Sequence, residues 1–365
     1  MLIAIEPGKT ECRYADLCIP EEYGIYQSVG DTTGPGGLIR ARRALPLFFD
    51  FAKAIENVCP DAWVINYTNP MTLCTAALYK AFPEVKAFGC CHEVFHTEDL
   101  LCTLVEKEYG VRPSRRELRV NLTGVNHFTF ITGAWWQGKD LMPLVRKEAA
   151  KDENLTDHTE IAKKRIEGEK WFDNDHLIAY SFLERFNALG AAGDRHLAEF
   201  VPWFLTSDEV LNSYGVVRTP YSWRLRTAEE KKAKTFTDEE LVASPSGEEG
   251  VDIMMALLGD KPLLTNMNRP NEGQIAYLPK GRIVESLGYI TQDSVLPIIS
   301  EDPPLAIQNL VRRISDEQEI ALEAIFEGDD DKLFEAFLMD PLMNLPISKA
   351  RELFDRMCRE GKLVY

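Results

Sequence analysis

The sequence predicts an α/β protein whose first part is built on a parallel sheet. From residue 2 to residue 109, short apolar segments that suit buried strands alternate with longer amphipathic segments that suit helices. After Pro113 the pattern changes to the apolar–polar alternation of antiparallel strands, and long helical segments follow. The 365 residues are enough for two domains. We therefore expect a parallel α/β domain followed by an α+β domain.

The first part contains three predicted strands and three predicted helices. The strands are expected at residues 2–5, 62–67 and 85–89, and the helices at 38–59, 71–82 and 93–109. Residues 16–23 are rich in charge and predict a polar loop. Because strands and helices alternate, the strands should run parallel.

The second part mixes antiparallel strands with helices. Alternation at residues 118–122 and 127–132 predicts two antiparallel strands, with a turn at 135–138. Two later apolar runs also predict strands, and three long segments predict helices, of which the second is charged and solvated. The later strands are expected at 263–267 and 275–278, and the helices at 141–189, 227–242 and 303–365.

Composition excludes several classes of function. The net charge of −17 argues against nucleic acid and anionic membranes as partners. No apolar run approaches the roughly 20 residues of a membrane span, and residues 1–8 lack the basic start of a signal peptide. The eight cysteines form no C-x-x-C pair, so neither a disulfide framework nor a zinc ribbon is indicated. We expect a reducing, cytoplasmic setting.

Three apolar runs end on residues that carry chemistry, and the ends of parallel strands are where α/β sheets bind ligands. Cys91 follows one run and His127 follows another. A thiolate and an imidazole suit Mn, Fe, Co, Ni or Zn, and two protein ligands leave positions open for catalysis. Judged by spacing alone, it is commoner for such a cysteine to be a core residue and for the histidine to be unrelated to it than for the two to bind a metal.

Acid–base candidates lie near this pair and in a later polar cluster. His92 could donate a proton to a substrate oxygen, or it could be a hydrogen-bonded structural histidine. Asp194 could be a base and Arg195 could clamp a carboxylate, with His196 close by in sequence. The alternative is that Asp194 caps a helix.

A polar Asn and a Gly-rich segment are candidates for ligand binding. Asn69 could bind a sugar hydroxyl or a cofactor, or could be a turn residue before Pro70. Glycines in residues 30–37, among them Gly34 and Gly36, allow close backbone approach to a ligand, although a surface turn explains them as well. Their spacing is neither G-x-G-x-x-G nor a P-loop.

These motifs, taken together, resemble glycoside hydrolase family 4, the NAD- and metal-dependent glycosidases that do not use a carboxylate pair. They span most of the chain in the family's order. The matching segments are residues 19–27, 30–37 with Arg40, Asn66-Tyr67-Thr68-Asn69-Pro70-Met71, Cys91-His92-Glu93-Val94, Gly124-Val125-Asn126-His127-Phe128, residues 193–200, 246–250 and 271–274.

The resemblance implies a fold, cofactors and a substrate. The fold would be a truncated Rossmann-like NAD-binding domain at residues 1–115 and an α+β domain at 116–365 for substrate, metal and oligomerisation. The Cys-His-Glu-Val form and residues 193–200 are similar to the α-galacturonidase branch, and α-glucosidases of the family are the neighbouring alternative. NAD, a divalent metal such as Mn, a uronic acid substrate and a homodimer or homotetramer are expected.

In the mechanism that the resemblance implies, NAD⁺ oxidises C3 of the sugar, a base removes the C2 proton, the glycosidic oxygen leaves and water adds. Cys91 and His127 would bind the metal, with Asp194 as the base and His92 as the acid. Further substrate contacts would come from Asn69, Arg195 and His196. The nicotinamide side would be lined by Gly34, Gly36 and Asn69.

The start of the chain differs from the family pattern. A Rossmann glycine loop is absent, so on the order of 80 residues of the nucleotide domain are expected to be missing. A catalytically inactive remnant is therefore one alternative. A 2-hydroxy-acid dehydrogenase is a more distant one, which the Cys91–His127 pair argues against because that chemistry needs no thiolate ligand.

Overall fold

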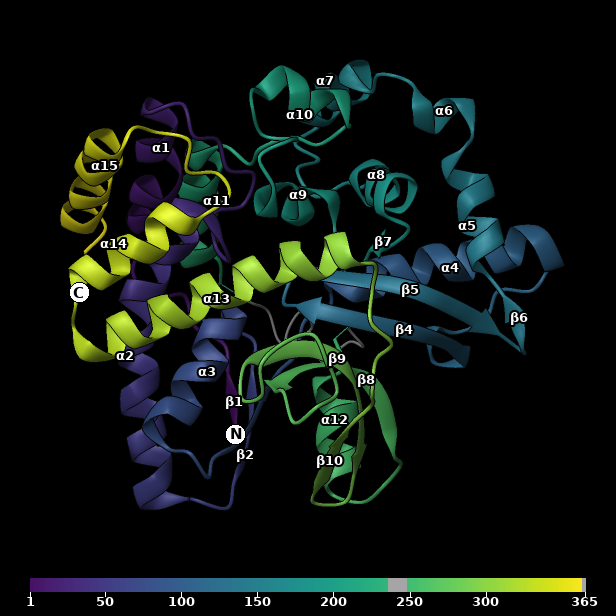
Figure 1. The fold of residues 1–365 in the computed structure, drawn as a ribbon, viewed down its shortest axis with the longest axis horizontal. Coiled ribbons are helices and arrows are strands. Elements are labelled where there is room, and N and C mark those ends of the chain that lie inside the picture. The colour runs from purple at the N-terminus through teal and green to yellow at the C-terminus, as the bar shows by residue number, and fades with distance from the viewer. Residues whose placement is uncertain (236–247, 363–365) are drawn as a thin grey trace.

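A single mixed sheet of ten strands runs through the computed structural model, which describes residues 1–235 and 248–362. Its strand order is β1-β2-β3-β8-β9-β4-β5-β6, with β10 beside β9 and β7 beside β5. Helices cover the parallel end at the left of Figure 1, and antiparallel strands make up the rest. The expected combination of a parallel α/β part with an α+β part is confirmed.

The parallel end of the sheet is formed by the first three strands, as predicted. These strands are β1 (Leu2–Ile3), β2 (Trp63–Asn66) and β3 (Lys86–Gly89). The helices that connect and flank them are α2 (Gly34–Val58), α3 (Met71–Ala81) and α4 (Glu93–Tyr109). Because β2 and β3 pair at Asn66 and Gly89, the chain leaves both strands at the same edge of the sheet.

The antiparallel strands come from two later stretches of the chain. A hairpin joins β4 (Leu118–Val125) to β5 (Phe128–Trp136), which confirms the antiparallel pair expected there. β3 meets the second stretch where Gly89 pairs with Asn268. The remaining strands are β6 (Lys139–Asp140), β7 (Leu189–Gly190), β8 (Leu263–Pro270), β9 (Ile283–Thr291) and β10 (Ser294–Pro297).

Helices make up most of the remaining described chain. Residues 141–189 are largely helical, as predicted, and α8 follows a left-handed residue, His176. Elements of this middle region are α5 (Met142–Ala149), α6 (Asp152–Leu155), α7 (Thr159–Glu167), α8 (Leu177–Phe186), α9 (Asp194–Leu197), α10 (Asp208–Ser213), α11 (Tyr221–Ala233) and α12 (Gly250–Leu257). Short 3-10 helices lie at Thr10–Cys12, Arg115–Glu117 and Ala198–Phe200.

The C-terminal helices close the main core. They are α13 (Leu305–Glu327), α14 (Asp330–Met339) and α15 (Ile347–Glu360), in the region predicted to be helical. α13 packs on α2 and α3, and it crosses the front of the molecule in Figure 1. The side chains of Leu45, Phe48 and Ala52 on α2 are fully buried, because they recur at helical spacing on the side of α2 that faces the core.

Two sequence expectations are wrong. Residues 16–23 do not form a loop, since Arg13–Glu22 is a helix, α1. Asp16 is buried there and accepts hydrogen bonds from Arg13 and Arg43, so charged residues occupy core-facing positions and hide the helical pattern. Residues 275–278 form no strand, and β9 begins at Ile283 instead.

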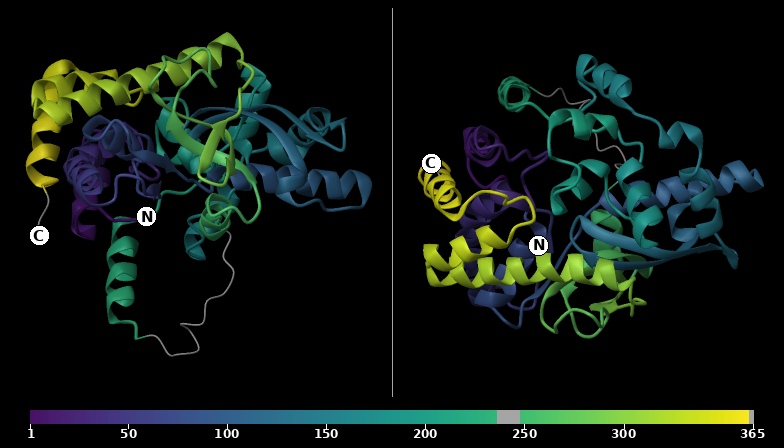
Figure 2. Two further views of the ribbon diagram at one scale, coloured as in Figure 1. Left: turned by 90° about the horizontal axis from the view of Figure 1, so that it is seen from below. Right: turned by 45° about the horizontal axis from the view of Figure 1, so that its top comes forward.

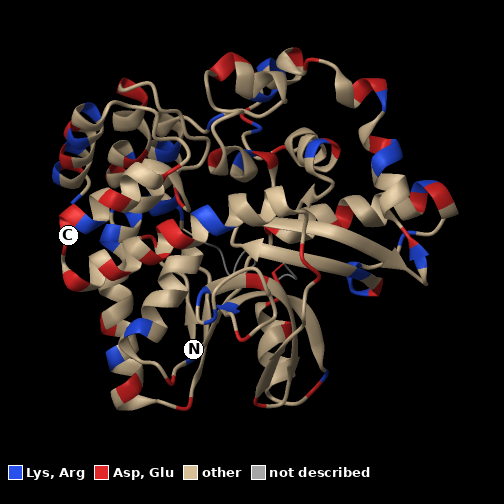
Figure 3. Cartoon of the chain, in the orientation of Figure 1, with Lys and Arg blue, Asp and Glu red and all other residues tan. Residues whose placement is uncertain are grey.

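Charged residues lie mainly on the outer helices, whereas β4 and β5 are largely uncharged in Figure 3. α11 projects from the body (Figure 2) and contains no fully buried residue. The helix predicted at 227–242 agrees with α11 in part, and its residues from 236 on lie outside the described residues, as do Ser246 and Gly247 of the family motif. Among the helices of the described chain, none has both the length and the apolar character needed to cross a bilayer.

Candidate active site

The sheet edge at which β2 and β3 end opens into a cavity of about 570 Å³. Three chain segments deliver polar side chains to it: residues 67–71 after β2, residues 90–93 after β3, and His127 in the β4–β5 turn. A fourth segment, residues 193–196 around the start of α9, also lines it. The rest of the lining consists of residues 172–174 and of Val29, Asp31, His96, Arg224 and Glu248. This is the position at which an open α/β sheet binds its ligands.

The structure brings Cys91 and His127 together. The Sγ atom of Cys91 lies 3.1 Å from Nε2 of His127, although the residues are 36 positions apart. His127 has a left-handed φ of 64°, which the tight turn between β4 and β5 requires and which histidine adopts more readily than most residues. A soft sulfur and an imidazole nitrogen are therefore adjacent at one wall of the cavity.

A hydrogen-bond chain fixes the imidazole ring of His127. Its Nδ1 lies 2.9 Å from Oγ1 of Thr32, and that hydroxyl lies 2.8 Å from Oδ1 of Asp31. If Nδ1–H donates to Thr32 and Thr32 donates to Asp31, Nε2 keeps its lone pair and points toward Cys91. Metal-binding histidines are commonly oriented in this way by their second nitrogen.

Burial sets the protonation of both groups in the absence of a cation. It lowers the pKa of His127 to about 3, with the nearby His196 ring contributing, so the imidazole is neutral at pH 7. It raises the pKa of Cys91 well above its usual value, although the Glu93 backbone amide and the Asn126 side chain lower it in part. A divalent cation would displace the thiol proton, as metals do at cysteine ligands, so this donor set fits a transition-metal ion.

Further donor atoms lie beside this pair. Asp31, His127 and His196 offer ligand atoms that all lie within 4.8 Å of one another, and the His127 and His196 rings are 4.0 Å apart. Oε1 of Glu93 lies 3.5 Å from Nε2 of His196. Burial alone would raise the pKa of Glu93, but the two imidazoles lower it to about 2, so this carboxylate is ionised.

His92 stands at the more open side of the cavity. Its Nδ1 lies 2.9 Å from Oε1 of Glu248, and its side chain is 51% exposed. It immediately precedes α4, whose first residue is Glu93. A histidine held by a carboxylate and open to the cavity can exchange a proton with a bound molecule.

Asp194 links the cavity to helix α8. Its Oδ1 accepts a hydrogen bond of 3.0 Å from the backbone amide of Ala179, so it caps α8 rather than the helix that it begins. Its Oδ2 is buried and has no hydrogen-bond partner among the described residues. Burial raises the pKa of Asp194 to about 7, against the effect of the amides at Leu177–Ala179.

The predicted substrate and cofactor residues divide into two groups. Asn69, Arg195 and His196 all line the cavity, and Oδ1 of Asn69 is buried without a partner in the described chain. Gly34 and Gly36 do not line it. A Cβ on either glycine would come within 3 Å of the Gln27 side chain or the Asp16 carbonyl, so protein atoms already fill that space. Of the three predicted NAD contacts, Asn69 alone faces the cavity, and the roles of the two glycines stay predictions.

Glu285 is a residue that the sequence reasoning missed. It is buried on β9, and Oε1 accepts a hydrogen bond of 2.8 Å from Nδ2 of Asn266, which also donates to the Cys91 carbonyl at 2.9 Å. Burial raises the pKa of Glu285 to about 7, while nearby amides, including the backbone of His127, lower it. The alternation of Asn266 and Asn268 in an apolar strand was the sequence feature that could have revealed this polar network.

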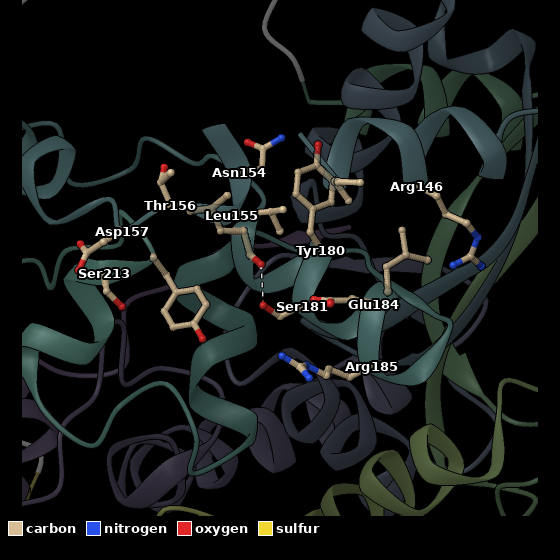
Figure 4. Close-up of a pocket in the computed structure, with 15 residues that line it drawn as sticks. Arg146, Asn154, Leu155, Thr156, Asp157, Tyr180, Ser181, Glu184, Arg185 and Ser213 are labelled. Carbon is tan, nitrogen blue, oxygen red and sulfur yellow. Dashed lines mark hydrogen bonds between the residues drawn. The ribbon is translucent and has the colours of Figure 1, made fainter. Parts of the chain in front are cut away.

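A second cavity, of about 620 Å³, lies among helices and is lined in part by α8. It is lined by residues of α5, α6 and α8 and by Ser213 and Tyr214, and Figure 4 shows Tyr180, Ser181, Glu184 and Arg185 of α8 around it. Its lining contains neither histidine nor cysteine. Size alone would favour this cavity, but the donor atoms lie in the other.

Comparison with known proteins agrees with the site. A family model described as "Family 4 glycosyl hydrolase" matches residues 1–107, and one described as "Family 4 glycosyl hydrolase C-terminal domain" matches residues 122–343. An "Alpha-galacturonidase" from Bacillus subtilis is 43% identical over 367 residues, which cover 98% of this chain and 80% of that protein.

Two solved structures are also similar. The crystal structure of lplD from Bacillus subtilis has a TM-score of 0.88 at 42% identity and covers 98% of this chain and 82% of that one. A 6-phospho-alpha-glucosidase from gut microorganisms, solved with NAD and Mn²⁺, shares the fold with a TM-score of 0.73 at 20% identity, covering 99% and 80%. By these matches, this chain belongs to family 4 of the glycosyl hydrolases.

Proposed function

We propose that this protein hydrolyses α-linked galacturonides with the help of NAD⁺ and a divalent cation such as Mn²⁺. The observation that carries the proposal is the 3.1 Å approach of Cys91 Sγ to His127 Nε2 in a cavity at the sheet edge. The substrate class is supported by the name of the 43% identical relative. The cofactors are supported by the soft donor pair and by the ligands of the structural neighbour.

When bound, NAD⁺ would accept and return the C3 hydride, and the cation would stabilise negative charge on the sugar oxygens. In this proposal Cys91 and His127 hold the cation, and Thr32 fixes the ring of His127. The unpartnered Oδ1 of Asn69 is available to accept a hydrogen bond from cofactor or sugar.

The proton transfers are proposed for two residues on the cavity wall. Asp194 would remove the C2 proton through Oδ2, which is buried and faces no protein partner among the described residues. His92, oriented by Glu248, would donate a proton to the leaving glycosidic oxygen. Arg195 and His196 are proposed to contact the sugar directly or to shape its pocket.

We further propose that residues 1–115 serve mainly the cofactor and residues 116–365 the substrate, the metal and oligomerisation. Cys91 and His127 then lie on opposite sides of this boundary, so the metal would join the two parts. A homodimer or homotetramer is proposed. A reducing, cytoplasmic location is proposed because all eight cysteines are free and the function needs one of them as a thiolate.

Hydrolysis of p-nitrophenyl α-galacturonide tests this function. The assay would contain NAD⁺, Mn²⁺ and a thiol reductant, with each component omitted in turn, and p-nitrophenyl α-glucoside as the competing substrate. We expect release of p-nitrophenol from the galacturonide that requires both NAD⁺ and Mn²⁺. Release from the glucoside alone would make the protein an α-glucosidase, and no release from either substrate would reject the proposed activity.

A further inference from the structure

Within the described chain, the arginines around the cavity donate to protein oxygens from both terminal nitrogens, with one exception, although Nε of Arg195 is also buried without a partner. Arg13 donates to the Gly30 carbonyl and to Asp16, and Arg40 pairs with Glu6. The terminal nitrogens of Arg195 donate to the carbonyls of Trp171 and Ser28 and to Oγ1 of Thr219. Arg195, the carboxylate clamp expected from the sequence, therefore already has three protein acceptors.

Arg224 is the exception. It lies in the first turn of α11 and lines the cavity. Its Nε and Nη2 atoms are buried, and within the described part of the chain neither has a hydrogen-bond partner. Burial, with the charges of Arg13 and Arg195, lowers its pKa to about 10, so the guanidinium remains positive at neutral pH. Charged donor atoms that are buried without a partner are unfavourable, unless a ligand supplies the missing acceptor.

The two free nitrogens of Arg224 form the edge of the guanidinium that matches a carboxylate. Elsewhere in this protein the same edge binds carboxylates side-on. Arg42 donates from Nε and Nη2 to the two oxygens of Asp330 at 2.8 and 2.9 Å, and Arg218 donates likewise to Asp208 at 2.6 and 2.9 Å. Such two-point contacts give both affinity and orientation.

The acidic side chains on the cavity wall favour a free cationic edge for binding an acidic ligand. Two carboxylate side chains, those of Asp31 and Glu93, line the cavity. A carboxylate entering the cavity would be repelled by these two anions. Arg224 offers a positive charge whose hydrogen-bonding edge no described residue occupies.

We propose that Arg224 binds the carboxylate group of the uronic acid and thereby selects an acidic sugar over a neutral one. This inference rests on the proposed function and adds the residue that determines its specificity. Arg195 then acts as a positioning residue, which holds the loop at Ser28 and stacks on Phe172 at 4.7 Å.

Binding and kinetics of two Arg224 variants test the inference. The variants are Arg224→Met and Arg224→Lys, and the matched control is Arg226→Met. Arg226 lies two residues further along α11, is 51% exposed and pairs with Glu169 outside the cavity. Binding would be measured by calorimetry on protein that contains Mn²⁺. NAD⁺ would be titrated alone, and D-galacturonate and D-galactose would be titrated with NAD⁺ already present.

We expect Arg224→Met to weaken D-galacturonate binding about 30-fold or more, because loss of a buried charge contact has effects of this size. The KM for p-nitrophenyl α-galacturonide should rise in parallel, with a much smaller change in kcat. Arg224→Lys should recover part of the loss, and Arg226→Met should match the wild type. Binding of D-galactose and of NAD⁺ should be unchanged in all variants.

Three results would overturn the inference. They are unchanged D-galacturonate binding in Arg224→Met, an equal loss for D-galactose, and a loss confined to NAD⁺, which would make Arg224 a cofactor contact. If the wild type hydrolyses the galacturonide while Arg224→Met is unaffected, this inference alone fails. If the wild type neither binds D-galacturonate nor hydrolyses the galacturonide, the proposed function fails as well.

Discussion

The two cavities beside α8 have similar volumes, about 570 and 620 Å³, but very different walls. The cavity at the sheet edge contains four histidines and two adjacent cysteines, whereas the helical cavity contains none. The first lies where parallel strands end, so that backbone segments far apart in sequence converge on it. The second is a gap among helices. The cavity suited to catalysis is therefore identified by the donor atoms that the fold brings together there. Cavity volume alone would not identify it.

The largest expected effect is the loss of a metal ligand. Cys91→Ser should lower Mn²⁺-dependent turnover of p-nitrophenyl α-galacturonide by more than about 100-fold, since even losing a residue that only supports a ligand costs 10–100-fold. The control is Cys59→Ser, because Cys59 follows α2 and does not line the cavity. Equal turnover in both variants would remove Cys91 from the metal site.

The second prediction concerns Asp194, which lines the sheet-edge cavity and accepts a hydrogen bond from the first turn of α8. Asp194→Asn should lower turnover by about 100-fold or more, the usual range for a lost general base. The fold should survive, because asparagine caps helices about as well as aspartate.

The same variant predicts a pH dependence of stability in the metal-free protein. Burial raises the pKa of Asp194 in the folded state to about 7, so the folded protein holds a proton that the unfolded chain releases above its ordinary pKa. Stability contributed by this proton is lost as the pH rises toward 7. The free energy of unfolding of Asp194→Asn, measured with urea, should therefore rise relative to that of the wild type. The expected rise is on the order of 1 kcal/mol per pH unit between pH 5 and 7. If the difference in unfolding free energy between variant and wild type did not change with pH, Asp194 would not have the raised pKa of a buried carboxyl.

A smaller effect is expected from replacing Glu285, which is linked through Asn266 to the backbone carbonyl of Cys91. Glu285→Gln keeps one acceptor oxygen and turns the other into a donor, so the side chain can no longer accept from Asn266 and from the other amides around it at once. This would disturb the network that holds the Asn266 bond to the Cys91 carbonyl. Affinity for Mn²⁺ should fall about 10-fold to 100-fold. Titration of Mn²⁺ by electron paramagnetic resonance measures this, and wild-type affinity would show that the network has no part in metal binding.

The smallest effect is expected in the helical cavity. The Arg185 side chain is exposed, lines that cavity and makes no ion pair or hydrogen bond with any described residue. Arg185→Met should leave turnover within about two-fold and the free energy of unfolding within about 0.5 kcal/mol of the wild type. A large loss of turnover would mean that this cavity also serves the reaction, and the contrast between the two cavities would fail.

Much of the proposed metal site could be predicted from sequence because it depends on local patterns. Apolar runs ending at Gly89 and Val125 place Cys91 and His127 just beyond strand ends. Parallel pairing brings the ends of β2 and β3 together, whereas His127 lies in the turn of the antiparallel β4–β5 hairpin, which meets Cys91 only in the folded sheet. The partners that complete the site were harder to find. Glu285 lies on β9, where Ser286 and Gly288 interrupt the apolar pattern, and Arg224 lies on a helix without a buried face.

The errors have physical causes of the same kind. α1 contains a buried Asp16 between arginines, so its inward face does not look apolar. The run at 275–278 is apolar because it is buried, but the side chain of Asn271 binds the carbonyls of Ile275 and Leu278 and holds it as a turn. Tertiary hydrogen bonds of this type leave no periodic pattern in the sequence.

The central claim is that Cys91 and His127 hold one divalent cation. Substitution with Co²⁺ tests it most directly, because a cobalt–thiolate bond gives a charge-transfer band in the near ultraviolet. The account predicts that the wild type and Cys59→Ser show this band at one Co²⁺ per chain, and that Cys91→Ser lacks it. An unchanged band in Cys91→Ser would contradict the account.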